Sequence, residues 1–433
     1  MIDWSTFLVD LLIQIPRTLL SPALYAFILL LFWYASRQIK QERRLFSVRV
    51  TSAPREIVQA LVPGIIVGAA ISILLLGFGI ALSYFDVLSL WIGSLLLGLI
   101  APRFAAAGYA GGVLIVLSAL FRQVDASGTG LFASLAGWMQ QVHAPAIAAL
   151  LGLLYVAEGI LLRRPSLYGC SPMLLTSQRG LVVGAYRVRR LWLVPLITFI
   201  ADGTGSYSFV LPSGWPWWAG AAVLSLLPLP LMIGHEDTAI VATPDEQMRR
   251  PGTWIMGLGL LIFVLGYLGT YWLPFAVLGG VLALAGHGTL RMYSRWQQKL
   301  HAPLYVQRNK GVCVLGVLPG SPADEMEIVT GDVIMRVNGQ SIAGVEDLYP
   351  ALQQQSAFCK MEVLNRDGHI KYVQRSVYQG DHHQLGLILA PEATGEMVGV
   401  SRMRRGGLLE RNHQPMDEPE SSVPLDQGKD VSF

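Results

Sequence analysis

The residues closest to a catalytic motif are His235 and Glu236, which are followed by Asp237, Thr238 and Ala239. A zinc metalloprotease needs His-Glu-x-x-His, because two imidazoles one helical turn apart bind the metal and the glutamate acts as a base. The second histidine is missing here. We therefore expect this stretch to be a solvated turn rather than an active site.

Other catalytic signatures are also missing from the sequence. It contains no Gly-x-Ser-x-Gly turn for a serine nucleophile and no glycine-rich phosphate loop that ends in Gly-Lys-Ser/Thr. Its three cysteines, Cys170, Cys313 and Cys359, are far apart and form no Cys-x-x-Cys pair. We expect no enzyme, no metal site and no cofactor.

Two acidic residues, Glu158 and Asp202, stand within or beside strongly apolar runs. An ionisable side chain at membrane depth suggests a function by default. Glu158, however, precedes Arg163 and Arg164 by about one helical turn, and we expect an ion pair there at the membrane interface. Asp202 is expected at the outer water boundary.

The elements that carry these residues are predicted to lie in a membrane. Of the 433 residues, 53% are hydrophobic and only 14% are charged, whereas soluble domains have about 25% charged residues. The low charge is the stronger signal, because a bilayer penalises charge most. The net charge of +3 is too small to indicate a nucleic-acid partner.

Residues 1–18 are predicted to form an interfacial amphipathic segment, and residues 19–290 a helical transmembrane domain. A helix needs about 20 mostly apolar residues to cross the hydrocarbon core. We expect nine spans if the interrupted run Leu191–Leu211 crosses, and eight if it does not. The candidate runs are Leu19–Ala35, Leu61–Ser83, Val87–Ile100, Ala105–Phe121, Ala144–Leu162, Leu191–Leu211, Trp217–Ile233, Trp254–Tyr271 and Leu273–Gly286.

Basic residues in short loops predict the orientation. They gather in Arg37–Arg55, Arg163–Arg190 and Arg291–Lys310. All three groups lie on one side only if Leu191–Leu211 crosses. Because positive loops stay inside, that side and the C-terminal part of the chain are expected in the cytoplasm.

Small residues recur four apart within the spans, at Gly64 and Gly68 and at Gly108 and Gly112. Such spacing lets two helices approach closely. The spacing is compatible with self-association of the chain, but we favour packing within one Gly-rich bundle.

After a juxtamembrane linker at residues 291–302, the composition becomes that of a soluble α+β domain at residues 303–392. Val312–Val317 and Val333–Val337 read as strands, and Asn338-Gly339 is a strong hairpin signal. A helix is expected to begin at Val345. Residues 393–433 are polar and rich in charge, and we expect a disordered tail.

This domain resembles the PDZ family. The motifs are Val-x-Pro-Gly-Ser-Pro-Ala from Val317, Gly-Asp-Val-Ile-x-x-Val-Asn-Gly from Gly331 and a helix that opens Glu-Asp-Leu at Glu346. The resemblance implies that the domain binds the C-terminus or an extended segment of a partner protein. The peptide would add as a strand beside a helix, with backbone N–H groups holding its carboxylate.

The PDZ resemblance also implies a set of site residues. The best match to the carboxylate-binding loop lies at the end of the domain, so we expect a circularly permuted PDZ in which the last strand receives the peptide. The alternative is that Leu304–Val306 receives it and the last strand is part of the core. The predicted peptide-binding residues are Leu385, Gly386, Leu387, Ile388 and Leu389, with Leu348 and Leu352 on the helix side.

The layout of the whole chain is similar to that of the MinJ family of division-topology proteins from rod-shaped Gram-positive bacteria. Matching details are Ser177–Gly180, Arg190–Pro195 and the stretch Asp381–Gly386 with its two histidines, His382 and His383. The resemblance implies a non-enzymatic adaptor that links a polar scaffold to a Min inhibitor of division. It further implies a multi-pass cell-membrane location, enriched at septa and poles.

Two other functions are compatible with the same features. The chain could be an accessory, substrate-presenting subunit of a membrane protease system, or a transporter that carries a PDZ localisation module. The chain's own end also offers a PDZ ligand, because Val431 and Phe433 are apolar at the third-last and last positions.

Overall fold

The structure is a computed structural model of the chain. It describes residues 4–48, 50–125, 128, 130–166, 168–176, 182–200, 209–210, 223–306, 311–355, 358–376, 385–391 and 401–402. Several sequence-based predictions lie outside these residues: those on Asp202, His382, His383, Ser177–Gly180, Val431, Phe433 and most of the tail. Within the tail, β12 (Ser401–Arg402) pairs in parallel with a strand of the membrane part.

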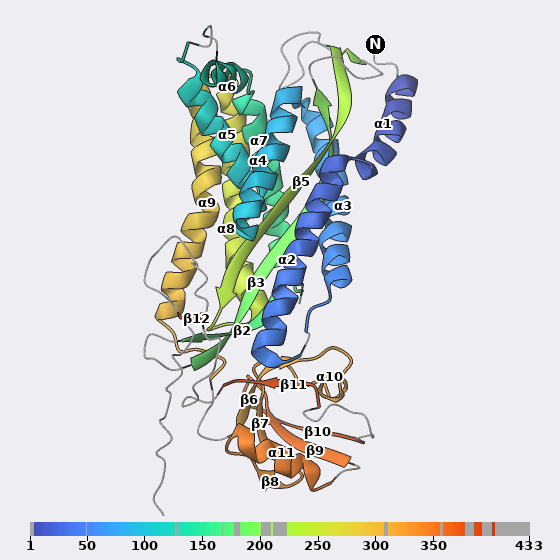
Figure 1. Cartoon of the computed structure of the whole chain (residues 1–433), viewed down its shortest axis with the longest axis vertical. Helices are drawn as coiled ribbons and strands as arrows, with labels where there is room; N and C mark the ends of the chain where they lie inside the picture. The colour runs from blue at the N-terminus through green and yellow to red at the C-terminus, as the bar shows by residue number, and fades with distance from the viewer. Residues whose placement is uncertain are drawn as a thin grey trace, which may run out of the picture.

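The first part of the chain, which we call the membrane body, is an upright bundle of helices beside two long strands (Figure 1). Its helices are α1 (Trp4–Leu19), α2 (Pro22–Phe46), α3 (Ala53–Phe78), α4 (Tyr84–Ile100), α5 (Ala107–Phe121), α6 (Leu131–Gln140), α7 (Ala144–Arg163), α8 (Pro244–Gly269) and α9 (Leu273–Lys299). Its strands are β1 (Ala81–Leu82), β2 (Cys170–Thr176), β3 (Val182–Ile200), β4 (Phe209–Val210) and β5 (Val223–Ala239).

The membrane body is a helical membrane region, as the sequence predicted. Among the described residues, 5 helical segments are long and apolar enough to cross a bilayer. The first of them joins the end of α1 to α2, and the others are α3, α7, α8 and α9. The helices α4 and α5 are apolar but shorter.

The apolar runs at 191–211 and 217–233 are not helices where the structure describes them. Their described parts belong to β3, β4 and β5. Strands β3 and β5 pair antiparallel from Tyr186 with Ala239 to Ile200 with Ser225. Proline explains part of the difference, because it disrupts a helix interior. Pro195 lies directly opposite Pro230 in the ribbon, and Pro228 follows two residues away along β5.

The outer edge of β3 is covered by α3. A Cβ added to Gly64 would lie 1.9 Å from the carbonyl oxygen of Leu193, and one added to Gly68 would lie 2.2 Å from that of Pro195. The hydroxyl of Ser72 accepts a hydrogen bond of 2.8 Å from the Ile197 amide. Glycine is therefore required for this close approach, and the first Gly pair packs within the chain, as we favoured.

The second Gly pair also packs internally. A Cβ on Gly108 would lie 2.4 Å from the Tyr155 hydroxyl, and one on Gly112 would lie 2.8 Å from the carbonyl oxygen of Gly280. These contacts join α5 to α7 and α9. Both spacings thus bring elements of one chain together.

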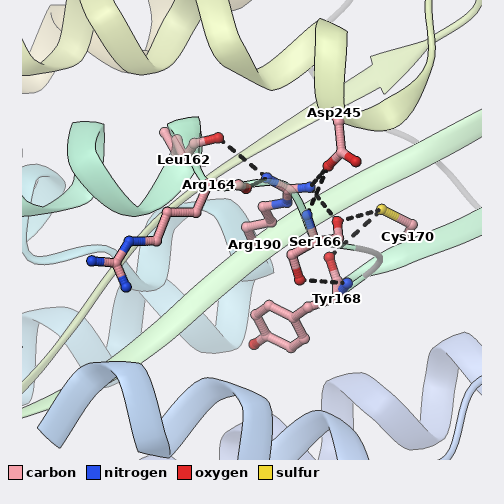
Figure 2. A network of polar contacts seen from close by, with 7 residues as sticks. All are labelled: Leu162, Arg164, Ser166, Tyr168, Cys170, Arg190 and Asp245. Atoms are coloured by element: carbon pink, nitrogen blue, oxygen red, sulfur yellow. Dashed lines mark hydrogen bonds and ion pairs between the residues drawn. The ribbon is translucent and has the colours of Figure 1, made fainter. Parts of the chain in front are cut away.

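A buried arginine joins β3 to the start of α8 (Figure 2). The side chain of Arg190 is fully buried and lies 2.5 Å from a carboxylate oxygen of Asp245. It also donates hydrogen bonds to the carbonyl oxygens of Leu162 and Arg164, at 3.2 and 3.1 Å, and to that of Ser166. One guanidinium therefore bonds one open carbonyl group in the last turn of α7 and two carbonyl groups just after the helix.

The second part of the chain is a small α+β domain below the membrane body (Figure 1). Its strands are β6 (Val312–Val317), β7 (Val333–Val337), β8 (Gln340–Ser341), β9 (Phe358–Leu364), β10 (Ile370–Ser376) and β11 (Leu387–Leu389). Its helices are α10 (Pro322–Glu325) and α11 (Val345–Gln353). The strand order is β10-β9-β7-β6-β11, with β8 paired to β7.

The predicted elements of this domain are confirmed. Strands β6 and β7 have the bounds expected from the sequence, and α11 begins at the expected residue. At the hairpin between β7 and β8, Asn338 and Gly339 have φ of 52° and 87°. Both central residues of a type I′ turn need positive φ, which Asn-Gly accepts most readily.

The domain docks on the membrane body through apolar and polar contacts. The hydroxyl of Tyr186 on β3 donates to the carbonyl oxygen of Leu315 on β6. Leu315 and Ile388 belong to the same buried hydrophobic cluster as the membrane body. At the rim, Arg366 lies 3.6 Å from Glu246.

Candidate functional site

Strand β11, which carries the predicted peptide-binding residues Leu387, Ile388 and Leu389, lies at one end of the domain's sheet. It pairs antiparallel with β6, Leu387 opposite Val317, and it is the last strand of its sheet among the described residues. An edge strand presents unpaired N–H and C=O groups that another extended chain can pair with. The sheet therefore ends at the strand that the sequence predicted to be the receiver.

The turn before β11 has an unusual backbone. Leu385 and Gly386 have φ of 53° and 77°, both in the left-handed region. Their carbonyl oxygens accept hydrogen bonds from Ala323 and Leu318, at 3.0 and 2.9 Å. The start of α10 thus holds this turn in place and fixes where β11 begins.

Gly386 is required at this turn for steric reasons as well. A Cβ on it would lie 2.2 Å from the Cβ of Ser321. A larger residue would therefore push the turn away from α10. Replacement of Gly386 is expected to disrupt the fold locally and is a poor test of peptide binding.

The side chains of β11 and α11 meet in one hydrophobic cluster. Leu348 is buried in it together with Leu385 and Leu387. Leu352 and Leu389 are only partly buried against the same cluster. Of the predicted site residues on these two elements, Leu352 and Leu389 are therefore the ones that a bound side chain could contact.

Ile388 faces the other way. It is 5% exposed and packs in the cluster of the membrane body, and its neighbour Gly316 lies close to the Tyr186 hydroxyl. Successive side chains of a strand point to opposite faces of the sheet. The structure therefore places Leu387 and Leu389 toward the domain and Ile388 toward the docking interface.

The alternative receiving strand, Leu304–Val306, belongs to the membrane body instead. The Leu304 amide donates to the carbonyl oxygen of Ile240 at 2.8 Å, and the Gly184 amide donates to that of Tyr305 at 2.9 Å. Tyr305 is fully buried. This backbone is occupied by β3 and the end of β5, so the geometry favours β11.

Neither cysteine thiol of this domain is exposed to solvent. Cys313 and Cys359 are both buried. Burial raises the pKa of the Cys359 thiol to about 11, which leaves it protonated near neutral pH.

The structure corrects two predictions about polar residues in the membrane body. His235 and Glu236 lie on β5, and His235 is 1% exposed, so this stretch is not a solvated turn. Glu158 does not pair with Arg163 or Arg164; its carboxylate lies 2.7 Å from His287. Sequence spacing could not reveal this pair, because its partners come from α7 and α9.

The PDZ assignment has independent support from comparison with known families. Residues 314–366 match the model of the PDZ domain. The match extends from β6 into the turn after β9 and includes α11. The small α+β domain is therefore a PDZ domain.

Comparison over the whole chain gives related proteins of known name. The chain is 29% identical over 412 residues to the cell division topological determinant MinJ of Bacillus subtilis, covering 90% of this chain and 97% of that protein. The chain is a MinJ homologue. It is also 28% identical over 381 residues to the probable MinJ of Lacticaseibacillus paracasei, covering 84% of this chain and 94% of that protein.

The homology covers the membrane body as well as the PDZ domain. It confirms the resemblance drawn from the sequence and agrees with a non-enzymatic topology factor of the Min system. Our MinJ homologue is thus a multi-pass membrane protein whose recognised soluble module is a peptide-binding domain.

Proposed function

We propose that this MinJ homologue is a membrane adaptor that recruits division proteins through its PDZ domain. The observation that carries the proposal is the position of β11, an edge strand whose Leu389 is only partly buried against the domain core, as is Leu352 of α11. A partner's C-terminal or extended segment would pair with the backbone of Leu387–Leu389. Its carboxylate would be held at the turn Leu385–Gly386.

The proposed domain is a circularly permuted PDZ. In the common order, the carboxylate loop and receiving strand precede the strand that corresponds to β6. Here β11 pairs with β6 but is the last strand of the domain along the chain, which supports the permutation.

The proposed location is the cell membrane, with the PDZ domain in the cytoplasm. The basic C-terminal ends of α2 and α9 lie toward the PDZ domain (Figure 1). Because basic segments remain inside, their shared end supports a cytoplasmic PDZ. We further propose that β3 and β5 cross the bilayer as a pair enclosed by helices. Together with the 5 long helical segments and the shorter helices α4 and α5, this would restore the predicted count of nine crossings.

The proposed partners are those that the MinJ resemblance implies: a polar scaffold on one side and a Min inhibitor of division on the other. The adaptor would gather at septa and poles and keep division from those sites. This role needs binding but no catalysis.

A pair of substitutions on α11 tests the peptide site. Leu352→Arg places a charge where Leu352 packs against the domain's cluster, whereas Tyr349→Arg changes an exposed residue, 40% accessible, of the same helix. We expect Leu352→Arg to weaken capture of a C-terminal peptide of the partner at least about tenfold, roughly 1.4 kcal/mol, and Tyr349→Arg to leave it unchanged.

The same variants are tested in dividing cells as fluorescent fusions. Wild type and Tyr349→Arg should mark septa and poles, and Leu352→Arg should lose partner recruitment while remaining in the membrane. Equal peptide capture by both variants would move the site away from α11. A uniform membrane signal of the wild type would count against the division role.

A further inference from the structure

Three chemistry-bearing side chains meet inside the membrane body: Glu158 from α7, His235 from β5 and His287 from α9. Each is 1% exposed. One ligand atom from each, a carboxylate oxygen and two imidazole nitrogens, lies within 4.8 Å of the other two. The elements that carry them are far apart in sequence and are brought together only by the fold.

Hydrogen bonds fix the state of His287. Its Nδ1 lies 2.9 Å from the Tyr155 hydroxyl, which itself donates to the carbonyl oxygen of Ala283. Nδ1 must therefore carry the proton and donate it to Tyr155. Nε2 is directed at Glu158 Oε1, 2.7 Å away, and a single proton can occupy that contact.

His235 supplies the second observation. In the described part of the chain, neither of its ring nitrogens has a hydrogen-bond partner, although the side chain is buried. Its ring stacks on His287 with centroids 5.5 Å apart. A buried polar group without a partner destabilises a fold, so the arrangement is incomplete as it stands.

We propose that Glu158, His235 and His287 bind one Zn²⁺ ion. Imidazole nitrogens and a carboxylate oxygen are zinc ligands, and three protein ligands of this type leave a fourth position for water. The metal would replace the proton between His287 and Glu158 and give His235 the partner that it lacks. It would also compensate the Glu158 charge, which is costly at membrane depth.

The required movements are at most about 1.5 Å, because the three ligand atoms already lie within 4.8 Å of one another. Zinc bonds of about 2.0–2.1 Å in a tetrahedron place two ligand atoms roughly 3.3 Å apart. The 2.7 Å contact between Glu158 and His287 must therefore open by only a few tenths of an ångström on each side. The Tyr155 hydroxyl would stay as the outer partner that orients His287.

Bound zinc would join α7, α9 and β5 at one point. That role is structural and goes beyond the proposed peptide binding of the PDZ domain. No cysteine takes part, because the candidate ligands are two nitrogens and one oxygen.

The test uses the full chain purified in detergent, treated with chelator, reloaded with Zn²⁺ and freed of excess metal. We expect about one Zn²⁺ per chain by elemental analysis, and X-ray absorption should show nitrogen and oxygen neighbours without sulfur. A zinc content near zero after loading would overturn the proposal. So would a sulfur-containing shell, which would place the metal at Cys170, Cys313 or Cys359.

Variants then locate the ion. His235→Phe and His287→Phe should each lower the zinc content at least about tenfold, and the control His301→Ala, an exposed histidine outside the cluster, should keep it. A folded His235→Phe chain with full zinc content would overturn the site. If both Phe variants fail to fold, the wild-type X-ray absorption spectrum decides, because two imidazoles give a distinct scattering pattern.

Discussion

In the membrane body, the outer edge of β3 lies under α3, and Ser72 accepts from its backbone. In the PDZ domain, β11 ends the sheet, and its outer side pairs with no other described strand. Both regions use antiparallel strands, but α3 covers this part of β3, whereas no described strand covers the outer side of β11. In lipid, every backbone polar group must be satisfied internally. In water, the free N–H and C=O groups of an edge strand can bind water until a partner strand pairs with them.

The two regions use glycine for different purposes. Gly64 and Gly68 let a helix lie directly on strand carbonyl groups, and no side chain fits between them. Gly386 permits a left-handed turn that begins the open strand. Gly64 and Gly68 therefore let α3 cover the edge of β3, whereas Gly386 fixes where the open edge strand β11 begins.

The largest expected effect comes from forcing the closed edge apart. Gly68→Leu would place its Cβ 2.2 Å from the backbone oxygen of Pro195, which cannot rotate away. We expect a loss of about 3 kcal/mol or more in the stability of the membrane body. The measurement is thermal unfolding of the detergent-solubilised chain.

Gly257→Leu is the matched control for that substitution. It lies within α8, and a Cβ there meets nothing within 4 Å. It should unfold at nearly the wild-type temperature. If Gly68→Leu did the same, α3 could not be covering β3 as described.

The next effect concerns the buried guanidinium of Arg190. Arg190→Met would remove the cation beside Asp245, whose carboxylate keeps the hydrogen bond from the Ser166 amide, and would take this donor from three carbonyl groups. Removal of one member of a buried ion pair costs about 3–5 kcal/mol, but Asp245 is 39% exposed and can be hydrated. We therefore expect about 2 kcal/mol, measured by the same unfolding assay.

Arg187→Met serves as its control, because the Arg187 side chain only donates to Gln41 in an exposed hydrogen bond. It should change stability by less than about 0.5 kcal/mol. Equal losses for the two variants would mean that the burial of Arg190 is irrelevant.

The PDZ domain was the easier region to predict from the sequence. Its strands are short, and Asn338-Gly339 and the Pro319–Ala323 turn mark their ends, so local chemistry was enough. The membrane body lacked such marks. Leu191–Ile200 is apolar throughout, and a buried strand and a membrane helix share that composition.

Proline was the available signal for β3 and β5, since Pro195, Pro228 and Pro230 all fall within the ribbon. The sequence signal for the cluster of Glu158, His235 and His287 was weaker. Glu158 stood alone in an apolar run, but its partner His287 is 129 residues away. Only tertiary contacts reveal such a pair, so the sequence suggested a nearby arginine instead.

A smaller effect is expected where the two regions meet. Tyr186→Phe removes the hydrogen bond to the Leu315 carbonyl group and leaves that acceptor buried. We expect a loss of about 1 kcal/mol in docking. Faster hydrogen exchange of the β6 amides in the full chain would report it, by about fivefold.

Tyr305→Phe is a close control for this interface. Tyr305 stacks near Tyr186, with ring centroids 5.4 Å apart, but its buried hydroxyl has no hydrogen-bond partner in the described structure. Its removal should leave β6 exchange unchanged or slightly slower. Acceleration equal to that of Tyr186→Phe would contradict a specific role for the hydroxyl of Tyr186.

The smallest effect is a pH dependence confined to the PDZ domain. Burial raises the pKa of Asp332, although the Val329 amide donates to its carboxylate and partly offsets the shift. A carboxyl with a raised pKa holds its proton more tightly in the folded state. Its charge therefore destabilises the fold as pH rises above the unfolded value of about 3.9.

Asp332→Asn removes this titration and keeps an oxygen for Val329. In urea unfolding of residues 311–391, the variant should thus gain stability relative to wild type between about pH 4 and 7. If the wild type instead gained stability relative to Asp332→Asn over that range, the hydrogen bond from Val329 would outweigh burial. The charged carboxylate would then stabilise the domain.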